Sequence, residues 1–189
     1  MRQINTNRFL YDAIRPYAQG KKTLDIGCGD GAYSSLSEDT VRLDRDEKFK
    51  PDVALDLRTS ALPFKDDEFE CILILDALQH LSRNRAREIL RQAKAVTSGR
   101  IYVLVPLRNE MDANRSSWSP GDFKGWTRID FGNYFFGYWD FDPSKVEEIS
   151  DMEPDPPEPE VEVSTTNPDE DSKGAEIRSP FGYKTDWDY

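Results

Sequence analysis

The chain has 189 residues, a length that suits one domain with a short appendage. Its net charge of −11 is concentrated at one end, because residues 150–189 hold 12 Asp and Glu against 3 Lys and Arg, whereas residues 1–149 hold 24 against 22. The nearly neutral body argues against nucleic acid as a partner, and no apolar run approaches the roughly 18 residues that a membrane span needs.

The first predicted elements are a helix and three short strands. Apolar residues at helical spacing predict a helix over residues 6–18, and Gly20 suits its C-terminal end. Residues 23–26 predict a strand that a glycine-rich turn stops, and residues 41–44 and 52–55 are candidate second and third strands.

The central part of the chain predicts the fold class. Residues 70–75 are apolar on both faces, as a central parallel strand requires, and residues 101–105 predict the next buried strand. Between them, apolar residues follow one side of a predicted helix: Ala86, Ile89, Leu90, Ala93 and Val96. This alternation predicts an α/β, Rossmann-like fold with a mostly parallel sheet flanked by helices.

The pattern loosens beyond Pro106. Residues 126–141 carry eight aromatic residues and predict a buried terminal strand pair, with an aromatic pocket or base-stacking platform as the alternative. Residues 107–142 are few for a helix and two antiparallel strands, so we expect an abbreviated C-terminal end. We place a globular domain at residues 1–148 and a largely disordered, acidic, Pro-rich tail with an aromatic C-terminal segment at residues 149–189.

A glycine-rich turn follows the first strand. Residues 24–31 read LDIGCGDG, and glycine lets a backbone turn tightly and approach a ligand closely. Gly27, Gly29 and Ala32 also satisfy the dinucleotide fingerprint, which would indicate an NAD-type oxidoreductase. A purely structural turn is a further alternative.

Acidic residues follow three successive predicted strands. Asp44 ends the second strand, where a carboxylate can accept both hydroxyls of a ribose. Asp56 and Asp76 follow the third and fourth strands in the same way. Each acid alone is usually a cap, but three at successive strand ends are hard to obtain from turn chemistry.

In combination these motifs resemble the class I S-adenosylmethionine-dependent methyltransferases, in particular the type 11 group. The residues that carry the resemblance lie within about 22–106: LDIGCGDG, the acidic second-strand end, Asp56 with LPFKDDEFE, and the strand that runs into LDALQHL. The resemblance implies methyl transfer from S-adenosyl-L-methionine to an acceptor, with no metal.

The resemblance also implies cofactor contacts by position. The methionine end would be held by residues of the glycine-rich turn: Asp25, Gly27, Cys28, Gly29 and Gly31. Asp44 would bind the ribose, and Asp56 and Leu57 would flank the adenine. Asp76 and Ala77 would lie beneath the sulfonium.

Acceptor-side residues are fewer. His80, the sole histidine, is a candidate general base, and a histidine bonded to backbone at a helix start is the alternative. Arg115 and Trp118 lie in a segment that resembles the helix start after the family's fifth strand, and both would face the acceptor unless Trp118 serves packing. Gln79 departs from the family, which usually has Glu there.

We therefore expect a methyltransferase with a small-molecule acceptor, and the tail is a candidate contact for a protein partner. The N-terminus lacks a signal-peptide core and the two cysteines suggest no disulfide framework, so we expect a cytoplasmic location. A non-catalytic interaction module and an NAD-type oxidoreductase are the alternatives. Cationic residues along the helix after the fourth strand predict a solvated face, with nucleic-acid contact as the alternative: Arg83, Arg85, Arg87, Arg91, Lys94 and Arg100.

Overall fold

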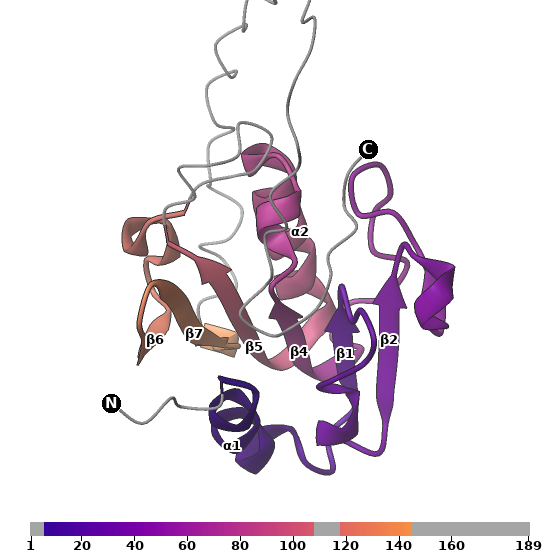
Figure 1. Ribbon diagram of the computed structural model, residues 1–189, viewed down its shortest axis with the longest axis horizontal. Helices are drawn as coiled ribbons and strands as arrows, with labels where there is room; N and C mark the ends of the chain where they lie inside the picture. Colours follow the sequence, from indigo (N-terminus) through magenta and orange to yellow (C-terminus); the bar gives the residue numbers. More distant parts are fainter. Residues whose placement is uncertain (1–5, 108–117, 145–189) are drawn as a thin grey trace, which may run out of the picture.

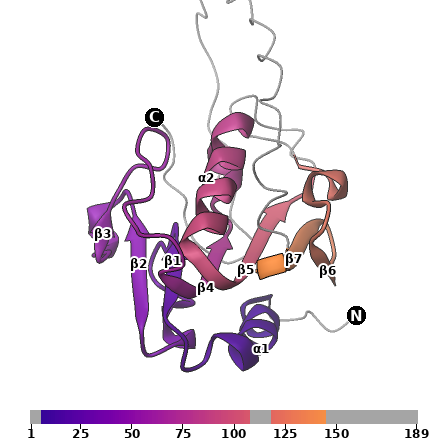
Figure 2. The ribbon, with the colours of Figure 1, turned by 180° about the vertical axis from the view of Figure 1, so that it is seen from behind.

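One seven-stranded sheet organises the molecule (Figure 1). The computed structural model describes residues 6–107 and 118–144. The strand order is β3-β2-β1-β4-β5-β7-β6, and Figure 2 shows β3 and β6 at the two edges. The strands are β1 (Thr23–Ile26), β2 (Thr40–Asp44), β3 (Val53–Ala54), β4 (Phe69–Leu75), β5 (Thr97–Pro106), β6 (Thr127–Phe131) and β7 (Tyr134–Asp140). Strands β1 to β5 pair in parallel, whereas β7 is antiparallel to β5 and β6, which confirms the Rossmann-like α/β prediction.

Two α-helices cover opposite faces of the sheet (Figure 1). Helix α1 (Thr6–Ala18) buries Leu10 and Ile14 on the face that carries Leu73 of β4. Helix α2 (Arg83–Val96) packs on the other face, and the Ser82 hydroxyl caps its N-terminus by accepting from the Arg85 N–H. Within the described part of the chain, no helix is long and apolar enough to cross a bilayer.

The remaining connections contain only short 3-10 turns in the described residues. They are η1 (Ser34–Leu36), η2 (Glu47–Phe49), η3 (Leu78–His80) and η4 (Pro120–Phe123). Parallel crossovers usually contain an α-helix, so the sheet has fewer covering helices than the predicted pattern of alternation implies. Before β6, η4 stands where a last helix was expected, and residues 108–117 lie outside the described part, as do the predicted boundary at 148 and the tail.

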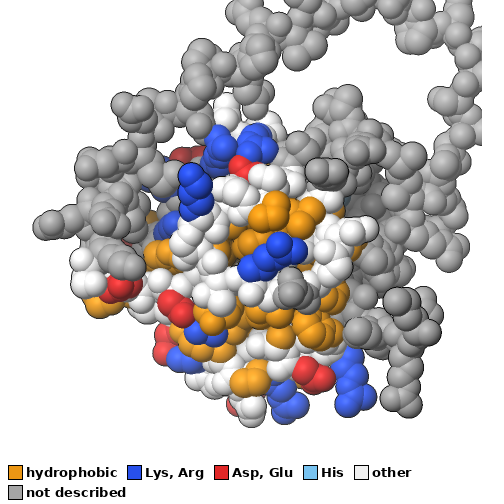
Figure 3. Space-filling model, turned by 90° about the vertical axis from the view of Figure 1, so that its left-hand side faces the viewer, with side chains coloured by type: hydrophobic (Ala, Val, Ile, Leu, Met, Phe, Trp, Pro, Cys, Tyr) orange, Lys and Arg blue, Asp and Glu red, His pale blue; other side chains and the backbone are white. Residues whose placement is uncertain are grey.

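The aromatic stretch forms the predicted terminal strand pair, β6 and β7. On one face the Phe135 ring stacks on Phe123 with 3.9 Å between centroids. Figure 3 views the side of the molecule that β6 and β7 form, where hydrophobic side chains gather around cationic groups. Among the residues at this end, the Lys94 ammonium lies 4.9 Å from the Trp139 ring centroid and 5.8 Å from that of Trp126.

Gly99 sets how closely β5 passes β4. A Cβ atom at this position would overlap the carbonyl oxygen of Glu70 and lie 2.9 Å from the Tyr17 hydroxyl. We expect Gly99→Ala to lower the free energy of unfolding in urea by about 2–3 kcal/mol, because the backbone must shift. Gly121→Ala is the control, since its nearest neighbour would be the Ser119 hydroxyl at 3.6 Å. Equal stability of the two variants would contradict this strand packing.

Candidate active site

Four segments meet at the carboxyl edge of the parallel strands. Because β1, β2, β3 and β4 point the same way, their C-terminal ends share one edge, where open α/β sheets bind ligands. The predicted cofactor residues follow these ends: the turn 27–31 after β1, Asp44 in β2, Asp56 and Leu57 after β3, and Asp76 and Ala77 after β4. Asp25 lies within β1 itself.

The glycine-rich turn fits tightly between two neighbours and is open on its outer side. The Gly27 and Cys28 N–H groups both donate to the Leu43 carbonyl, at 2.8 and 3.1 Å. Gly27 has a φ of +71°, and a Cβ there would lie 2.7 Å from the Ala77 Cβ. Gly29 has a φ of +51°, but a Cβ there would meet no atom within 4 Å. The turn therefore needs glycine at Gly27 for packing and leaves space at Gly29.

The Asp44 carboxylate holds this turn. It is 2 % exposed, its Oδ2 accepts the Gly29 N–H at 2.9 Å, and its Oδ1 accepts the Asp46 N–H at 2.9 Å. A carboxylate oxygen can accept more than one hydrogen bond, so both oxygens keep capacity for a ligand hydroxyl. Asp44 thus has a structural role that the sequence did not predict.

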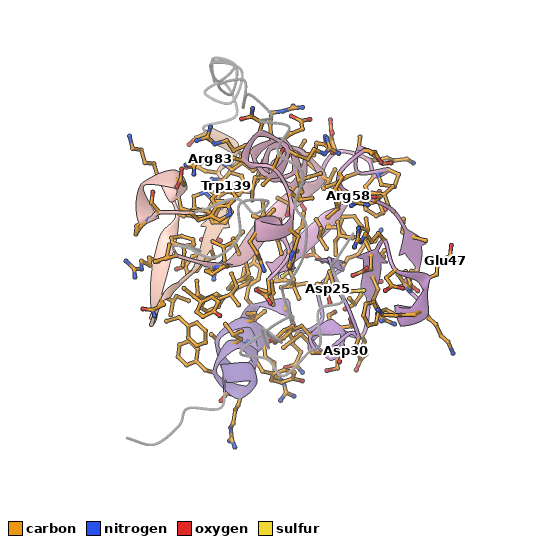
Figure 4. All side chains as sticks on the ribbon, turned by 45° about the horizontal axis from the view of Figure 1, so that its top comes forward. Asp25, Asp30, Glu47, Arg58, Arg83 and Trp139 are labelled. Atoms are coloured by element: carbon orange, nitrogen blue, oxygen red, sulfur yellow. The ribbon has the colours of Figure 1, made fainter. Side chains whose placement is uncertain are left out.

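Asp25 is a buried acid beneath the same turn. It is 3 % exposed, and the Ser34 hydroxyl donates to its Oδ2 at 3.1 Å. Burial raises the pKa of Asp25 to about 7, an effect that the Ser34 bond and the charge of Arg42 only partly offset. Figure 4 labels Asp25 near the middle of the molecule and Asp30 of the same turn toward its periphery. A cation brought by a ligand would favour the charged form of Asp25.

Asp56 is paired with a neighbour in its own loop. The Arg58 Nε donates to both carboxylate oxygens at 3.0 Å, and its NH2 donates to Oδ2 at 2.6 Å. These bonds lower the pKa of Asp56 despite some burial. An adenine amino group would share this carboxylate with Arg58 (labelled in Figure 4) or displace it.

The prediction of a solvated arginine face on α2 is wrong for several of its residues. The Arg85 guanidinium donates to the Leu57 carbonyl at 2.5 Å and the Ser60 carbonyl at 2.6 Å, so it fastens the loop after β3. Arg83 and Arg87 both pair with Asp122. These three arginines are therefore held by oxygen atoms of the protein itself.

A polar cluster follows β4. Asp76 has a φ of +59°, which is uncommon for a residue other than glycine. The Gln79 Nε2 donates to Asp76 Oδ1 at 2.6 Å and lies 3.3 Å from His80 Nε2. Gln79 is 4 % exposed and its Oε1 is buried with no hydrogen-bond partner. His80 lies in η3, so it contacts Gln79 and does not begin the α-helix as the alternative assumed.

Trp118, one of the two predicted acceptor residues, does not join this cluster. Trp118 is 2 % exposed, and its ring lies 5.3 Å from the Phe123 ring, so we assign it to packing. Arg115 lies outside the described residues. Tyr134, at the start of β7, was not singled out from the sequence. Burial and the charge of Asp76 raise the pKa of Tyr134 to about 12, so its hydroxyl stays a hydrogen-bond donor at neutral pH.

Cys28 is in an environment that disfavours the reactive thiolate. Burial and the nearby Asp25 and Asp44 raise the pKa of its thiol to about 12. Cys28 and Cys71 are both free and buried. Within residues 6–107 and 118–144, no group of three or more His, Cys, Asp or Glu side chains is arranged to hold a metal ion.

The raised pKa of buried Asp25 predicts how the free energy of unfolding depends on pH. The folded state binds its proton more tightly than an unfolded chain with a pKa of 3.8, so the free energy of unfolding falls as pH rises from about 4 to 7. The shift corresponds to a cost of up to roughly 4 kcal/mol above pH 7. We expect Asp25→Asn to be more stable than the wild type in urea at pH 8, by about 2–4 kcal/mol, and nearly equal at pH 4.

Asp30→Asn is the control for this experiment, because Asp30 lies in the adjoining turn but is exposed. It should change stability little at either pH. A gain for Asp25→Asn that does not depend on pH would contradict the raised pKa.

Comparisons with known proteins find methyltransferases with a similar sequence pattern and a similar fold. Residues 24–103 match the family described as "Methyltransferase domain". A SAM dependent methyltransferase from Archaeoglobus fulgidus has a TM-score of 0.52 and 18% identity, covering 66% of this chain and 73% of that protein. No curated protein gives a significant match.

Two further similar structures contain S-adenosylhomocysteine. The 1,6-didemethyltoxoflavin-N1-methyltransferase of Burkholderia thailandensis, which also has its 1,6-didemethyltoxoflavin bound, gives a TM-score of 0.53 and 13% identity, covering 72% of this chain and 79% of that protein. The magnesium protoporphyrin IX methyltransferase of Synechocystis PCC 6803 gives 0.53 and 14%, covering 71% and 80%. At such low identity, these structures show a shared fold.

Proposed function

We propose that the chain is a class I S-adenosylmethionine-dependent methyltransferase, which uses S-adenosyl-L-methionine to methylate a small-molecule acceptor by in-line displacement. The observation that supports this most directly is the glycine-rich turn. It lies against Ala77, is bonded to Asp44, and leaves open space at Gly29. A ligand that approaches this turn meets backbone and carboxylates from three strand ends.

The residues at this edge fit the chemical groups of the cofactor. Asp25 is a buried acid whose charged form an ammonium group would stabilise. Gly27, Cys28, Gly29 and Gly31 would surround the amino-acid end, and Asp44 would accept from the ribose hydroxyls. Asp56 and Leu57 would flank the adenine, and Asp56 would accept from its amino group beside or in place of Arg58.

When bound, the cofactor supplies a methyl group on a positively charged sulfur, so the protein needs chiefly to align the acceptor. Such positioning contributes on the order of 7–11 kcal/mol in favourable cases. Asp76 and Ala77 would lie beneath the sulfonium. Gln79 Nε2 can donate to His80 Nε2, which makes Nε2 the basic nitrogen of the ring. His80 would take a proton there from acceptors that must lose one, with the acceptor replacing Gln79 at that nitrogen.

The acceptor would lie over the C-terminal ends of β4 and β5 and the start of β7, beside the cofactor edge. Asp76 there supplies an acceptor and Tyr134 a donor. The toxoflavin and protoporphyrin compounds named for two structurally similar enzymes support a small molecule as the substrate class. Arg115 remains a proposed acceptor contact.

The remaining assignments are also proposals. A domain of residues 1–148 would carry the activity, and the acidic tail would be the contact for a protein partner. The two free, buried cysteines suit the reducing cytoplasm, where disulfides are rare.

Calorimetric titration tests the class of cofactor. We expect S-adenosylhomocysteine to bind the full chain and a reduced nicotinamide dinucleotide to give no binding heat. Binding of the nicotinamide alone would support the oxidoreductase, and binding of neither would support a non-catalytic module.

Asp44→Asn tests the ribose contact. The amide keeps the shape of the carboxylate but loses charge-assisted bonds of about 1.5–3 kcal/mol, so affinity for S-adenosylhomocysteine should fall at least tenfold. Glu38→Gln, which removes an exposed charge just before β2, should bind like the wild type. Unchanged affinity of Asp44→Asn would move the ribose contact elsewhere.

Gly27→Ala tests the close approach of the turn to the segment after β4. The added Cβ would overlap Ala77, so we expect at least a tenfold loss of affinity for S-adenosylhomocysteine in calorimetry. The double variant Gly27→Ala/Ala77→Gly removes the overlap and should recover part of the loss, with the strain of a positive φ remaining. No recovery would show that overlap with Ala77 is not the cause.

A further inference from the structure

Arg42 connects the glycine-rich turn to the loop after β2. Its NH2 donates to the Phe49 carbonyl at 2.9 Å and to the Gly29 carbonyl at 3.4 Å, and its NH1 donates to the Lys50 carbonyl at 3.3 Å. A Cβ at Gly31 would lie 3.1 Å from the same NH2. Gly29 is therefore held on both sides, through its N–H by Asp44 and through its carbonyl by Arg42.

Arg42 is also a near neighbour of two buried carboxylates in the sheet. In the parallel pairing of β1 and β2, Arg42 is the register partner of Asp25, and Asp44 is two residues further along the same face of β2. The positive charge of Arg42 lowers the pKa of Asp25, against burial and the charge of Asp44. The other titratable groups that sense Asp25 are the thiols of Cys28 and Cys71, whose raised pKa values keep them neutral.

The hydrogen-bond donors of Arg42 are not all satisfied by the protein. Its Nε is buried with no hydrogen-bond partner. A buried N–H without a partner is unfavourable, and an apolar side chain would fill the same space without that cost. The guanidinium is therefore better explained by its charge and its fork of donors than by packing alone.

We propose that Arg42 is a positioning residue of the cofactor site: it holds the glycine-rich turn against residues 47–50, and its charge makes Asp25 easier to ionise when the ammonium group of S-adenosylmethionine binds. The inference rests on the proposed function and deepens it. Arg42 would act in two ways. Its guanidinium hydrogen bonds to the backbone carbonyls hold the turn at every pH. Its charge affects ligand binding only at a pH where Asp25 would otherwise take up a proton.

The sign of the pH effect follows from Asp25. Without the charge of Arg42, Asp25 holds its proton to higher pH and presents a neutral acid to the ammonium group near pH 7. At a sufficiently high pH, Asp25 is ionised in every variant and this part of the loss disappears. The loss of affinity caused by losing the guanidinium hydrogen bonds remains at that pH.

The experiment is calorimetric titration of the full chain with S-adenosylhomocysteine at several pH values from 6 to 8.5. The variants are Arg42→Lys, which keeps the charge, Arg42→Gln, which removes it, and Lys124→Gln, which removes an exposed charge next to η4. Affinities are compared as ratios to the wild type at each pH, so that ionisation of the ligand cancels.

We expect Lys124→Gln to match the wild type and Arg42→Lys to lose about three- to tenfold at every pH. Arg42→Gln should lose at least a further tenfold at pH 7 and approach Arg42→Lys at pH 8.5. Losses for Arg42→Gln that are independent of pH, or wild-type affinity in both Arg42 variants, would overturn the proposal. Absence of binding by the wild type would instead overturn the proposed function.

Proton release is a second measurement that needs no Arg42 variant. In buffers of different ionisation enthalpy near pH 7, the wild type should release protons when S-adenosylhomocysteine binds, because Asp25 becomes fully ionised. Asp25→Asn should release fewer. Equal release by both proteins would contradict the ionisation of Asp25 on binding, on which the proposed charge effect of Arg42 depends.

Discussion

The hydrogen bond from the Gly29 N–H to the Asp44 carboxylate is the contact on which the site depends. It fixes the turn after β1 to the end of β2, and the same carboxylate bonds the Asp46 N–H at the start of the next loop. With the turn in this position, Gly27 reaches Ala77 after β4. Three strand ends are therefore joined by one buried acid and one close backbone approach.

The site holds features that a fold optimised only for stability would lack. Asp25 is buried with a raised pKa, Gln79 has an unpartnered Oε1, and Asp76 adopts a positive φ. Each is unfavourable for the protein alone. All three belong to the segments that the methyltransferase family match includes, which is where strain is expected to serve ligand binding.

The sequence predicted the sheet well because buried parallel strands are continuous apolar runs. Residues 70–75 lie within β4, and the helix predicted over 6–18 is α1 as observed. The connections were predicted less well, since a 3-10 turn such as η1 leaves no periodic signal. Strand β5 begins at Thr97, before the predicted 101, because Thr97 pairs with Phe69 across a local irregularity.

The site was predicted in part. Acids at strand ends are visible as sequence motifs, and the parallel sheet brings them to one edge. The partners of those acids are not visible, because Arg42 and Tyr134 reach the site only through strand pairing. The sequence predicts Arg85 to be one of several solvated arginines, but in the structure its guanidinium donates to the Leu57 carbonyl. The one signal in the sequence is the Arg within a short, largely apolar strand, as at position 42, because a charged residue there indicates a buried partner.

A crystal structure of the full chain with S-adenosylhomocysteine tests the central claim most directly. We expect the ligand at the carboxyl edge of the sheet, with its amino-acid end over Gly29, its ammonium toward Asp25 and its ribose hydroxyls on Asp44. A ligand bound away from that edge, or one whose ribose hydroxyls do not contact Asp44, would contradict it.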